Sequence, residues 1–393
     1  MWRSTFWYGP TVPTNTHRPN RRRASVLLVA VALLGLAACS SNKSSDTTVA
    51  AETSAPAETT AAAETTAAPA ETTAAPAAAT IAAATDTAAA AGSKPKLAIV
   101  YSGEFKDGSW GEAALKGAQK LKDDGVISDF ASQESVQPGA DAERALRDYA
   151  DQGYNPVIAH SFNYGDDVKK VAKDYPKTIF VYAGGFGDVK DNVGDYSQPF
   201  YQATYLEGIL AAGVSPKGNA AGAGGFDIPV CHSMLNAFVE GAKTVRPDVT
   251  GSFVAVGDWY DVAKAKEAAL GQLDGGASMF VGCGQGPTFG QIEAVKDKGG
   301  VAMGYVGDMS GLADKVLSSF VWRLDKVFAL IVADAAAGKT AAQYYEVPLK
   351  DGGMDIVVNP AWKDKIPADV IAKFDAKLAA IKDGSFEVPF KDK

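Results

Sequence analysis

Aromatic residues give this 393-residue chain its clearest chemical signal, because they fall in loops beside hydrogen-bonding side chains. An aromatic face next to a few donors and acceptors suits a small, flat, partly polar ligand. Packing between loops would explain any one of these aromatics, but less readily the whole set. The aromatic residues are Trp110, Phe162, Phe186, Phe226, Trp259 and Tyr260, and the polar residues near them are Ser109, Asn163, Asp227, Asp258, Gln285 and Asp308.

Histidine and cysteine are too sparse to indicate catalysis. His17 lies near the start of the chain, and His160 and His232 fall in two separate loops. No Ser-His-Asp, paired-carboxylate or His-Glu-x-x-His spacing occurs, so we expect no enzyme activity and no cofactor. His160, His232, Cys231 and Cys283 could converge as a zinc site, but their spacing matches no zinc motif, and we expect no metal.

Three alternating glycines, Gly282, Gly284 and Gly286, could indicate a phosphate or dinucleotide loop. The spacing is not G-x-G-x-x-G, and no acidic residue follows at a second strand end. We interpret them as glycines that let the backbone approach a ligand in a cleft.

Alternating strands and helices must hold these loops in place. Short apolar runs at 96–101, 157–160 and 178–183 predict buried strands, and the stretches 110–122 and 141–152 predict helices. Such alternation forms parallel sheets with both faces covered, and ligands bind beyond the carboxyl ends of the strands.

The stretch from Asp191 to Phe226 is predicted to join two α/β lobes. It holds a helix at 201–212, a turn at 215–218 and a strand that ends at Phe226. After it the alternation of strands and helices begins again. Two such sheets in tandem would face each other across a cleft.

The N-terminal segment is typical of an exported lipoprotein. The basic cluster Arg21 to Arg23 precedes an apolar run at 26–38, which is too short to span a bilayer, and the run leads to Cys39. Leu36-Ala37-Ala38-Cys39 resembles a bacterial lipobox, so residues 1–39 are expected to be a signal peptide with Cys39 as the lipidated residue. Arg22-Arg23 could suggest twin-arginine export, although the full motif is missing.

Residues 40–94 consist mainly of Ala, Thr, Pro, Glu and Ser. With almost no large apolar side chain, they predict a disordered tether. The expected location is therefore the extracytoplasmic face of the cell membrane, held by a lipid anchor.

The charge balance argues against a nucleic-acid partner. The chain carries 38 basic and 46 acidic side chains, for a formal net charge of -8, whereas phosphate binding requires a basic face. Two cysteines remain outside the lipobox. An exported protein permits a disulfide between Cys231 and Cys283, since the strand ends near them are often neighbours in a doubly wound sheet; two free thiols are the alternative.

The chain resembles the basic membrane protein family, whose members are nucleoside-binding lipoproteins of ABC importers. The resemblance covers roughly residues 96–339 and is specific as a set. The matching pieces are Asp107-Gly108-Ser109-Trp110, Tyr205-Leu206-Glu207-Gly208, Leu210-Ala211-Ala212, Gly224-Gly225-Phe226, Asp258-Trp259-Tyr260-Asp261 and Gly304-Tyr305-Val306-Gly307-Asp308-Met309.

That resemblance implies a fold, a domain division and a mechanism. The fold is the α/β type I periplasmic-binding-protein fold: two Rossmann-like lobes with parallel sheets, joined by three crossovers, which close on a ligand in the cleft between them. The expected lobes are residues 95–198 with 308–342, and residues 199–307 with 343–393. The expected hinges are 196–202, 308–310 and 341–346.

The same resemblance implies that two aromatics, Trp110 and Trp259, hold a base. Three polar family positions are replaced, by Tyr101, Val306 and Trp322, so a nucleoside should bind less well here than in the nucleoside-binding members of the family. The pattern resembles a branch of the family that takes a free purine base such as adenine. The resemblance and the loop composition together give the expected ligand residues Trp110, Ser109, Phe162, Asn163, Phe226, Trp259, Asp308 and Trp322, with Asp308 and Asn163 at the edge of the base.

These observations predict a monomeric substrate-binding lipoprotein that delivers a purine base or nucleoside-like heteroaromatic molecule to an ABC permease. A surface lipoprotein that uses the same fold for sensing or adhesion, without transport, remains the alternative.

Overall fold

The computed structural model describes residues 94–184, 186–196 and 198–393. The lipobox, Cys39 and most of the tether lie outside these residues. In the part that the structure describes, no helix is both long and apolar enough to cross a membrane.

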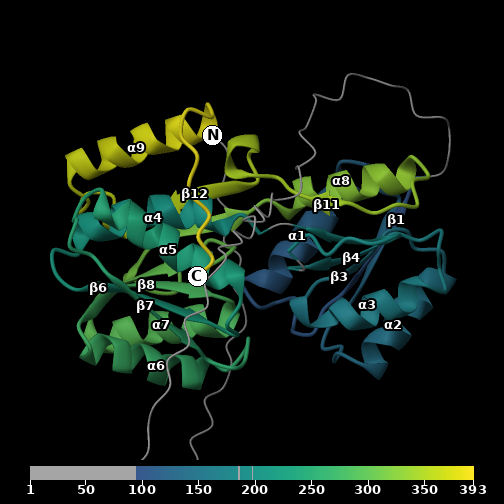
Figure 1. Ribbon diagram of the computed structural model, residues 1–393, viewed down its shortest axis with the longest axis horizontal. Helices are drawn as coiled ribbons and strands as arrows, with labels where there is room; N and C mark the ends of the chain where they lie inside the picture. The colour runs from purple at the N-terminus through teal and green to yellow at the C-terminus, as the bar shows by residue number, and fades with distance from the viewer. Residues whose placement is uncertain (1–93, 185, 197) are drawn as a thin grey trace, which may run out of the picture. The chain divides into compact units, whose positions relative to one another are not determined.

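Two six-stranded sheets organise the described chain (Figure 1). The first has the order β11-β5-β4-β3-β1-β2, and all of its strands are parallel. Its strands are β1 (Lys96–Val100), β2 (Asp129–Gln133), β3 (Val157–Ala159), β4 (Phe180–Ala183), β5 (Val193–Tyr196) and β11 (Tyr344–Tyr345). Strand β1 is almost entirely buried, as expected for a short apolar run covered on both faces.

The second sheet repeats this order as β12-β10-β9-β8-β6-β7, and only β12 is antiparallel to its neighbour. Its strands are β6 (Asn219–Gly224), β7 (Gly251–Ala255), β8 (Ala277–Cys283), β9 (Val301–Gly304), β10 (Val316–Trp322) and β12 (Met354–Val358). The repeated order matches the alternation that the sequence shows on either side of the joint.

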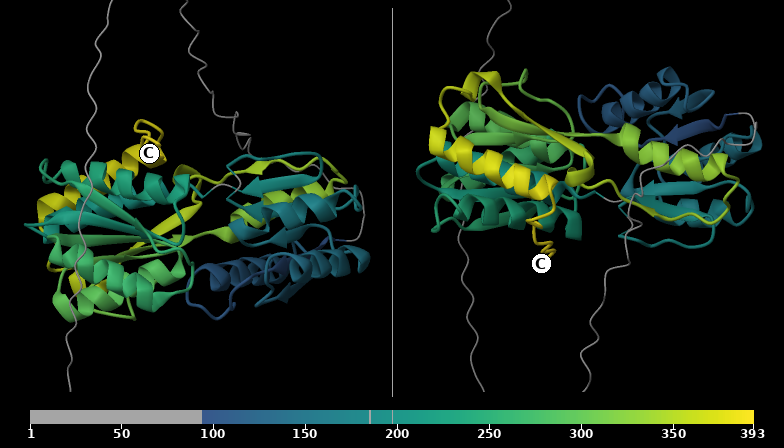
Figure 2. Two further views of the ribbon diagram at one scale, coloured as in Figure 1. Left: turned by 60° about the horizontal axis from the view of Figure 1, so that its bottom comes forward. Right: turned by 90° about the horizontal axis from the view of Figure 1, so that it is seen from above.

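Helices cover both faces of each sheet (Figures 1 and 2). The first sheet carries α1 (Trp110–Asp123), α2 (Ala140–Asp151), α3 (Gly165–Ala172) and α8 (Leu324–Ala336), in which α1 packs on α8 and α2 on α3. The second carries α4 (Phe200–Val214), α5 (Pro229–Lys243), α6 (Val262–Asp274), α7 (Gln285–Lys298) and α9 (Ala368–Lys382). We call the first sheet with its helices the first lobe, and the second sheet with its helices the second lobe.

Helix α4 is the most deeply buried helical element, because it packs on α5, on α9 and on β10. Gly208 and Gly241 allow the close approach of α4 and α5. A Cβ atom on Gly208 would lie 2.0 Å from the Phe238 carbonyl oxygen, and one on Gly241 would lie 1.8 Å from that of Tyr205. A larger residue at either position would force the helices apart.

Helix α4 also buries a carboxyl group. Glu207 is fully buried, and Ser318 Oγ donates a hydrogen bond to its Oε1 at 3.1 Å, while Oε2 has no hydrogen-bond partner. Burial raises the pKa of Glu207 to about 8, against a smaller lowering effect of the Ser318 hydrogen bond. The carboxyl group is therefore mostly protonated at neutral pH.

The strand pairing corrects the predicted lobe boundaries at two places. Strand β10 lies within the range 308–342 that the sequence assigns to the first lobe, yet it pairs with β9 and β12 in the second sheet. Strand β11 falls in the range assigned to the second lobe, yet it pairs with β5 in the first sheet. Local periodicity identifies a strand but does not say which sheet it joins.

The three crossings between lobes follow from this pairing. The chain passes from β5 to α4, from β10 to α8 and from β11 to β12. The first and third lie in or beside the predicted hinges at 196–202 and 341–346. The second lies at 322–324 rather than at the predicted 308–310, because the chain does not leave the second sheet before β10 ends.

Candidate functional site

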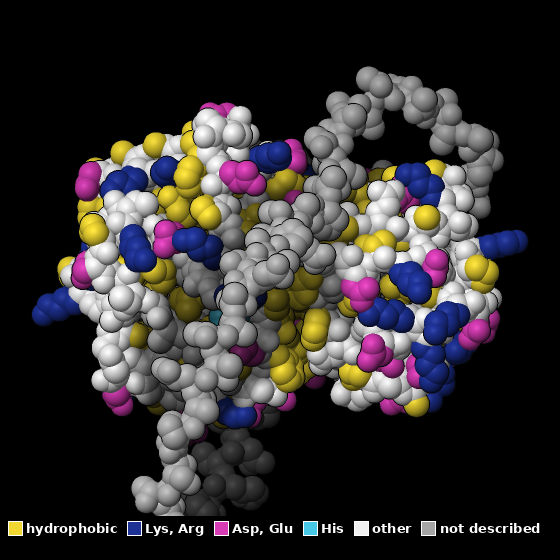
Figure 3. Space-filling view, viewed as in Figure 1, with side chains coloured by type: hydrophobic (Ala, Val, Ile, Leu, Met, Phe, Trp, Pro, Cys, Tyr) yellow, Lys and Arg dark blue, Asp and Glu magenta, His cyan; other side chains and the backbone are white. Residues whose placement is uncertain are grey.

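A cavity lies where the loops at the carboxyl ends of strands from both lobes meet. The cavity has a volume of about 50 Å³, enough for about four water molecules. The first lobe contributes Tyr101, Trp110, Ser161, Phe162 and Gly184, the segment between the lobes contributes Gln198, and the second lobe contributes Ile228, Val230, Trp259, Tyr260, Cys283, Gly284, Gln285 and Tyr305. Figure 3 shows hydrophobic side chains at the junction between the lobes.

Trp110 is held in place by His160. The Trp110 indole Nε1 donates to the His160 carbonyl oxygen at 3.0 Å, and His160 Nε2 lies 2.9 Å from the Trp110 carbonyl oxygen. The two rings stack with centroids 4.8 Å apart. Burial lowers the pKa of His160 to about 4, so the imidazole is neutral and donates from Nε2, while its Nδ1 accepts from the Tyr196 hydroxyl.

The start of α1 places Trp110 at the edge of the cavity. The Asp107 carboxylate accepts hydrogen bonds from the backbone N–H groups of Ser109, Gly111 and Glu112, at 2.8, 2.8 and 3.0 Å. These are donors that a helix N-terminus would otherwise leave unpaired. Trp110 is the first residue of α1, so the same contacts fix the backbone that carries its indole.

Trp259 lies against two glycines of the second lobe. A Cβ atom on Gly225 would lie 2.1 Å from Trp259 Cε3, and one on Gly284 would lie 2.7 Å from the same atom. Phe226 packs edge-on against the indole with ring centroids 5.2 Å apart. The Gly286 N–H donates to the Trp259 carbonyl oxygen at 2.7 Å. The other two alternating glycines also lie against protein groups, because a Cβ atom on Gly282 would lie 2.2 Å from Thr288 Oγ1 and one on Gly286 would lie 2.8 Å from the Tyr260 carbonyl carbon.

Three tyrosines complete the aromatic wall. The Tyr101 hydroxyl donates to Asp107 Oδ2 at 3.2 Å, and the Tyr260 hydroxyl lies 2.8 Å from Ser102 Oγ of the first lobe. Tyr305 is 3% exposed. Burial raises the pKa of Tyr101 and of Tyr305 above the usual tyrosine range, so these hydroxyls are neutral at physiological pH.

Three of the eight predicted ligand residues line this cavity: Trp110, Phe162 and Trp259. Phe226 instead supports Trp259, and Asn163 is exposed with its side chain outside the lining. Ser109 Oγ donates to the Tyr305 carbonyl oxygen at 3.2 Å, which joins the two lobes beside the cavity. These three residues lie next to the site without lining it.

Asp308 and Trp322 are also outside the lining. The Asp308 carboxylate accepts hydrogen bonds from the backbone N–H and the hydroxyl of Ser310, so it closes its own turn. Trp322 is buried in an aromatic cluster, with its ring centroid 5.1 Å from Trp110 and 4.8 Å from Phe200. Ser109, Asp308 and Trp322 line a separate hollow of about 380 Å³ beside α1.

Several lining residues were not among the predicted ligand residues: Tyr101, Ser161, Gln198, Ile228, Val230, Tyr260, Gln285 and Tyr305. Tyr101, Gln285 and Tyr305 each lie within two residues of a strand's carboxyl end, and this placement could have identified them. Nothing in the local sequence singles out Ile228 or Val230.

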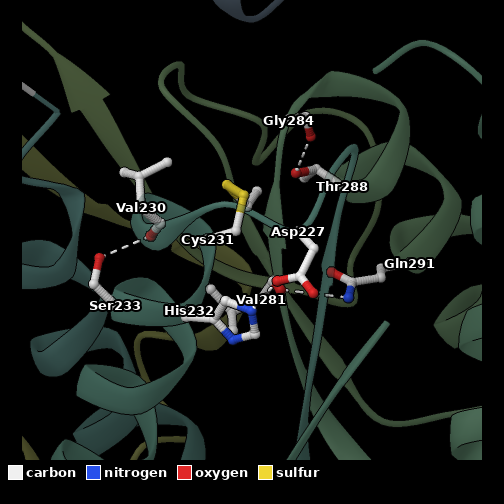
Figure 4. The surroundings of a disulfide bond; sticks show 10 residues. Asp227, Val230, Cys231, His232, Ser233, Val281, Gly284, Thr288 and Gln291 are labelled. Atoms are coloured by element: carbon white, nitrogen blue, oxygen red, sulfur yellow. Dashed lines mark hydrogen bonds and ion pairs between the residues drawn. A yellow bond between two sulfur atoms is a disulfide. The ribbon is translucent and has the colours of Figure 1, made fainter. Parts of the chain in front are cut away.

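A disulfide joins Cys231 of α5 to Cys283, the last residue of β8, with the Cα atoms 5.3 Å apart (Figure 4). Cys283 lines the cavity, so the bridge is part of its wall. His232 pairs with Asp227 next to the bridge (Figure 4). Among the described residues, no group of three or more His, Cys, Asp or Glu side chains could hold a metal ion.

Two lobes with repeated parallel sheets and a cavity between them define the type I periplasmic-binding-protein fold. A solved solute-binding protein of an ABC transporter from Conexibacter woesei has this fold. The TM-score between that structure and this one is 0.59, with 23% sequence identity, and the match covers 75% of this chain and 99% of the Conexibacter protein.

The family model of the PnrA-like substrate-binding proteins of ABC transporters, Bmp, matches residues 94–383, and the chain belongs to this family. Its members are binding proteins rather than enzymes, in agreement with the predicted family and fold.

Two relatives are named for different ligands. A purine-binding protein of Brucella abortus is 32% identical over 222 residues, which cover 56% of this chain and 62% of that protein. A protein of Haloferax volcanii, whose name proposes an ABC transporter glucose-binding protein, is 30% identical over 233 residues, covering 59% of this chain and 58% of that protein. The chain thus matches less than two thirds of the length of either relative.

Proposed function

We propose that this protein captures a neutral purine base in the cavity between its lobes and delivers it to the permease of an ABC importer. In this proposal the protein is a monomer on the extracytoplasmic face of the membrane, anchored through a lipid on Cys39. The ligand contacts both lobes only when they are closed, so it favours the form that the permease recognises.

The observation that carries this proposal is that two anchored tryptophans, one from each lobe, line a single small cavity. The backbone and the rings around them fix Trp110 and Trp259 before any ligand arrives. Fixed indoles bind a flat ring by stacking at little cost in conformational entropy. The similarity to a purine-binding protein supports the same ligand class.

A base fits this cavity better than a nucleoside or a sugar. The cavity volume is about 50 Å³, and no charged side chain is found among the lining residues that the structure describes. Ribose and glucose carry several hydroxyl groups, and each buried hydroxyl without a partner costs about 1 to 3 kcal/mol.

Isothermal titration of the purified protein, refolded after denaturation to remove any carried-over ligand, tests this proposal. The panel is adenine, guanine, adenosine, guanosine and glucose. We expect a free base to bind most tightly. Replacing either Trp110 or Trp259 by Ala should weaken its binding about 5- to 150-fold, because stacking of one base contributes about 1 to 3 kcal/mol.

Trp362→Ala is the matched control, because Trp362 lies in the second lobe outside the cavity lining and hydrogen-bonds to the Asp314 carbonyl oxygen. It should leave binding unchanged. Tight binding of glucose with none of the bases, or full base binding by the Trp110→Ala plus Trp259→Ala variant, would contradict the proposed function.

A further inference from the structure

The cavity wall contains two glutamines and no charged side chain among its described residues. Its other polar side-chain groups are the hydroxyls of Ser161 and the three tyrosines and the indole N–H groups of Trp110 and Trp259. A ligand that is read by these groups alone must be neutral, because an ionised group in such a site would lack a partner of opposite charge.

Most of the other polar groups are already engaged within the protein. Ser161 Oγ accepts from the Asn163 N–H at 3.3 Å. The hydroxyls of Tyr101 and Tyr260 are bonded to Asp107 and Ser102. These groups therefore have less capacity to recognise a ligand edge than a free amide has.

The two glutamine side chains are free. Within the part of the chain that the structure describes, neither the Gln198 nor the Gln285 amide hydrogen-bonds another residue, and both side chains are partly buried against the cavity. Each amide offers one acceptor and two donor hydrogens on adjacent atoms.

Gln198 and Gln285 come from different elements of the structure. Gln198 lies in the crossing between β5 of the first lobe and α4 of the second, where its carbonyl oxygen accepts from the Phe200 N–H at 2.7 Å. Its Nε2 lies close to Gly184, at 3.1 Å from the position of an added Cβ atom. Gln285 is the first residue of α7 and follows Gly284, whose φ of 110° turns the chain from β8 into the helix.

We propose that Gln198 and Gln285 determine ligand specificity, by binding a neutral base whose edge carries a donor next to an acceptor. This inference rests on the proposed function. An amide pairs with the amino group and ring nitrogen of adenine, as glutamine does when it reads adenine in nucleic acids. Guanine also offers an acceptor next to a donor, at O6 and N1, but in addition it presents two adjacent donors at N1 and N2, which a carboxylate accepts together and an amide does not.

Contact with both glutamines also ties recognition to closure. The segment that carries Gln198 is a crossing between lobes, and Gln285 belongs to the second lobe. A base bonded to both amides and stacked on Trp110 connects the two lobes, so the same contacts that select the ligand stabilise the closed state.

Titration of adenine and guanine against Gln198→Glu and Gln285→Glu tests the assignment. The wild type should bind adenine, whose amino group and ring nitrogen pair with an amide. Each variant should lose about tenfold or more in adenine affinity and shift the ratio of the two affinities toward guanine, because the carboxylate removes a donor and adds an acceptor. Gln285→Met, which keeps the length of the side chain but has no donor, should lose adenine affinity without any gain for guanine.

Gln137→Glu makes the same chemical change at an exposed position outside the cavity lining and should alter neither affinity. Thermal melting of each variant verifies that it is folded. Adenine binding that is unchanged in all three cavity variants, or a ratio of affinities that does not shift toward guanine in either Glu variant, would overturn the assignment while leaving the Trp-dependent capture of a purine intact. A wild type that binds neither base would overturn the proposed function itself.

Discussion

Glu207 makes the stability of the second lobe depend on pH, and the sign of the effect follows from its burial. In the unfolded chain this carboxyl group titrates at its ordinary value of 4.5, whereas in the folded protein burial raises its pKa to about 8. Between these two pH values the folded state holds a proton that the unfolded state has lost. The contribution of Glu207 to the free energy of unfolding is therefore largest below pH 4.5 and falls as the pH rises to about 8.

The size of the effect follows from the same two values. A pKa difference between 4.5 and about 8 corresponds to about 5 kcal/mol over the whole window, or about 1.4 kcal/mol for each pH step. This is a large part of the 5 to 15 kcal/mol of a typical domain. In Glu207→Gln the side chain keeps the shape of the protonated carboxyl and has no charge to lose.

Urea denaturation of the wild type and of Glu207→Gln at pH 5, 6, 7 and 8 measures this effect. The stability difference between the two proteins should change by several kcal/mol in favour of Gln across the series, since contributions from all other groups cancel. Glu267→Gln, at an exposed position of α6, should show no such trend. Ser318→Ala should extend the trend to higher pH, because the lost hydrogen bond favours the ionised form. A pH-independent difference between wild type and Glu207→Gln would refute the reasoning.

Two further changes test the construction of the cavity wall. Gly225→Ala should lower both the melting temperature and the ligand affinity, because its Cβ atom would lie 2.1 Å from the Trp259 ring and overpacking costs about 1 to 3 kcal/mol. The control for calorimetry and titration is Gly271→Ala, which has open space around it. Equal behaviour of the two variants would contradict the contact between Gly225 and Trp259. Replacing Cys231 and Cys283 together by Ala should lower the free energy of unfolding by about 4 kcal/mol, because the disulfide closes a loop with a sequence separation of 52 and so reduces the chain entropy of the unfolded state. A reducing agent should lower the urea midpoint of the wild type and leave the double variant unaffected. A wild type that is insensitive to reduction would count against the bridge.

The sequence predicts the alternating elements well, because their signals are local. Apolar runs identify β1, β3 and β4, and the joint helix appears within two residues of its observed ends, Phe200–Val214. Trp110, Phe162 and Trp259 follow β1, β3 and β7 in the chain and all line one cavity, as predicted, although Phe226, which follows β6, does not. In parallel sheets, all of these loops meet at the same edge.

Long-range pairing and loop conformation could not be predicted in the same way. Strand β10 joins the second sheet through residues far apart in the chain, which no local pattern shows. Asp308 follows a strand as a ligand residue would, but the preceding Val306 has a φ of 53° and the Asp308 carboxylate bonds to Ser310. Whether a side chain after a strand lines the cavity depends on such turns, so the sequence does not show that Gln285 lines it and Asp308 does not.

The neutral cavity wall has a consequence for the kinetics of capture. A charged cleft draws an oppositely charged solute by long-range attraction, and that advantage fades as salt screens it. The cavity of this protein, with no charged side chain among its described lining residues, offers no such attraction to a neutral solute. Encounter then depends on diffusion and on how often the lobes are open, so uptake should proceed at nearly the same rate in dilute and in saline surroundings.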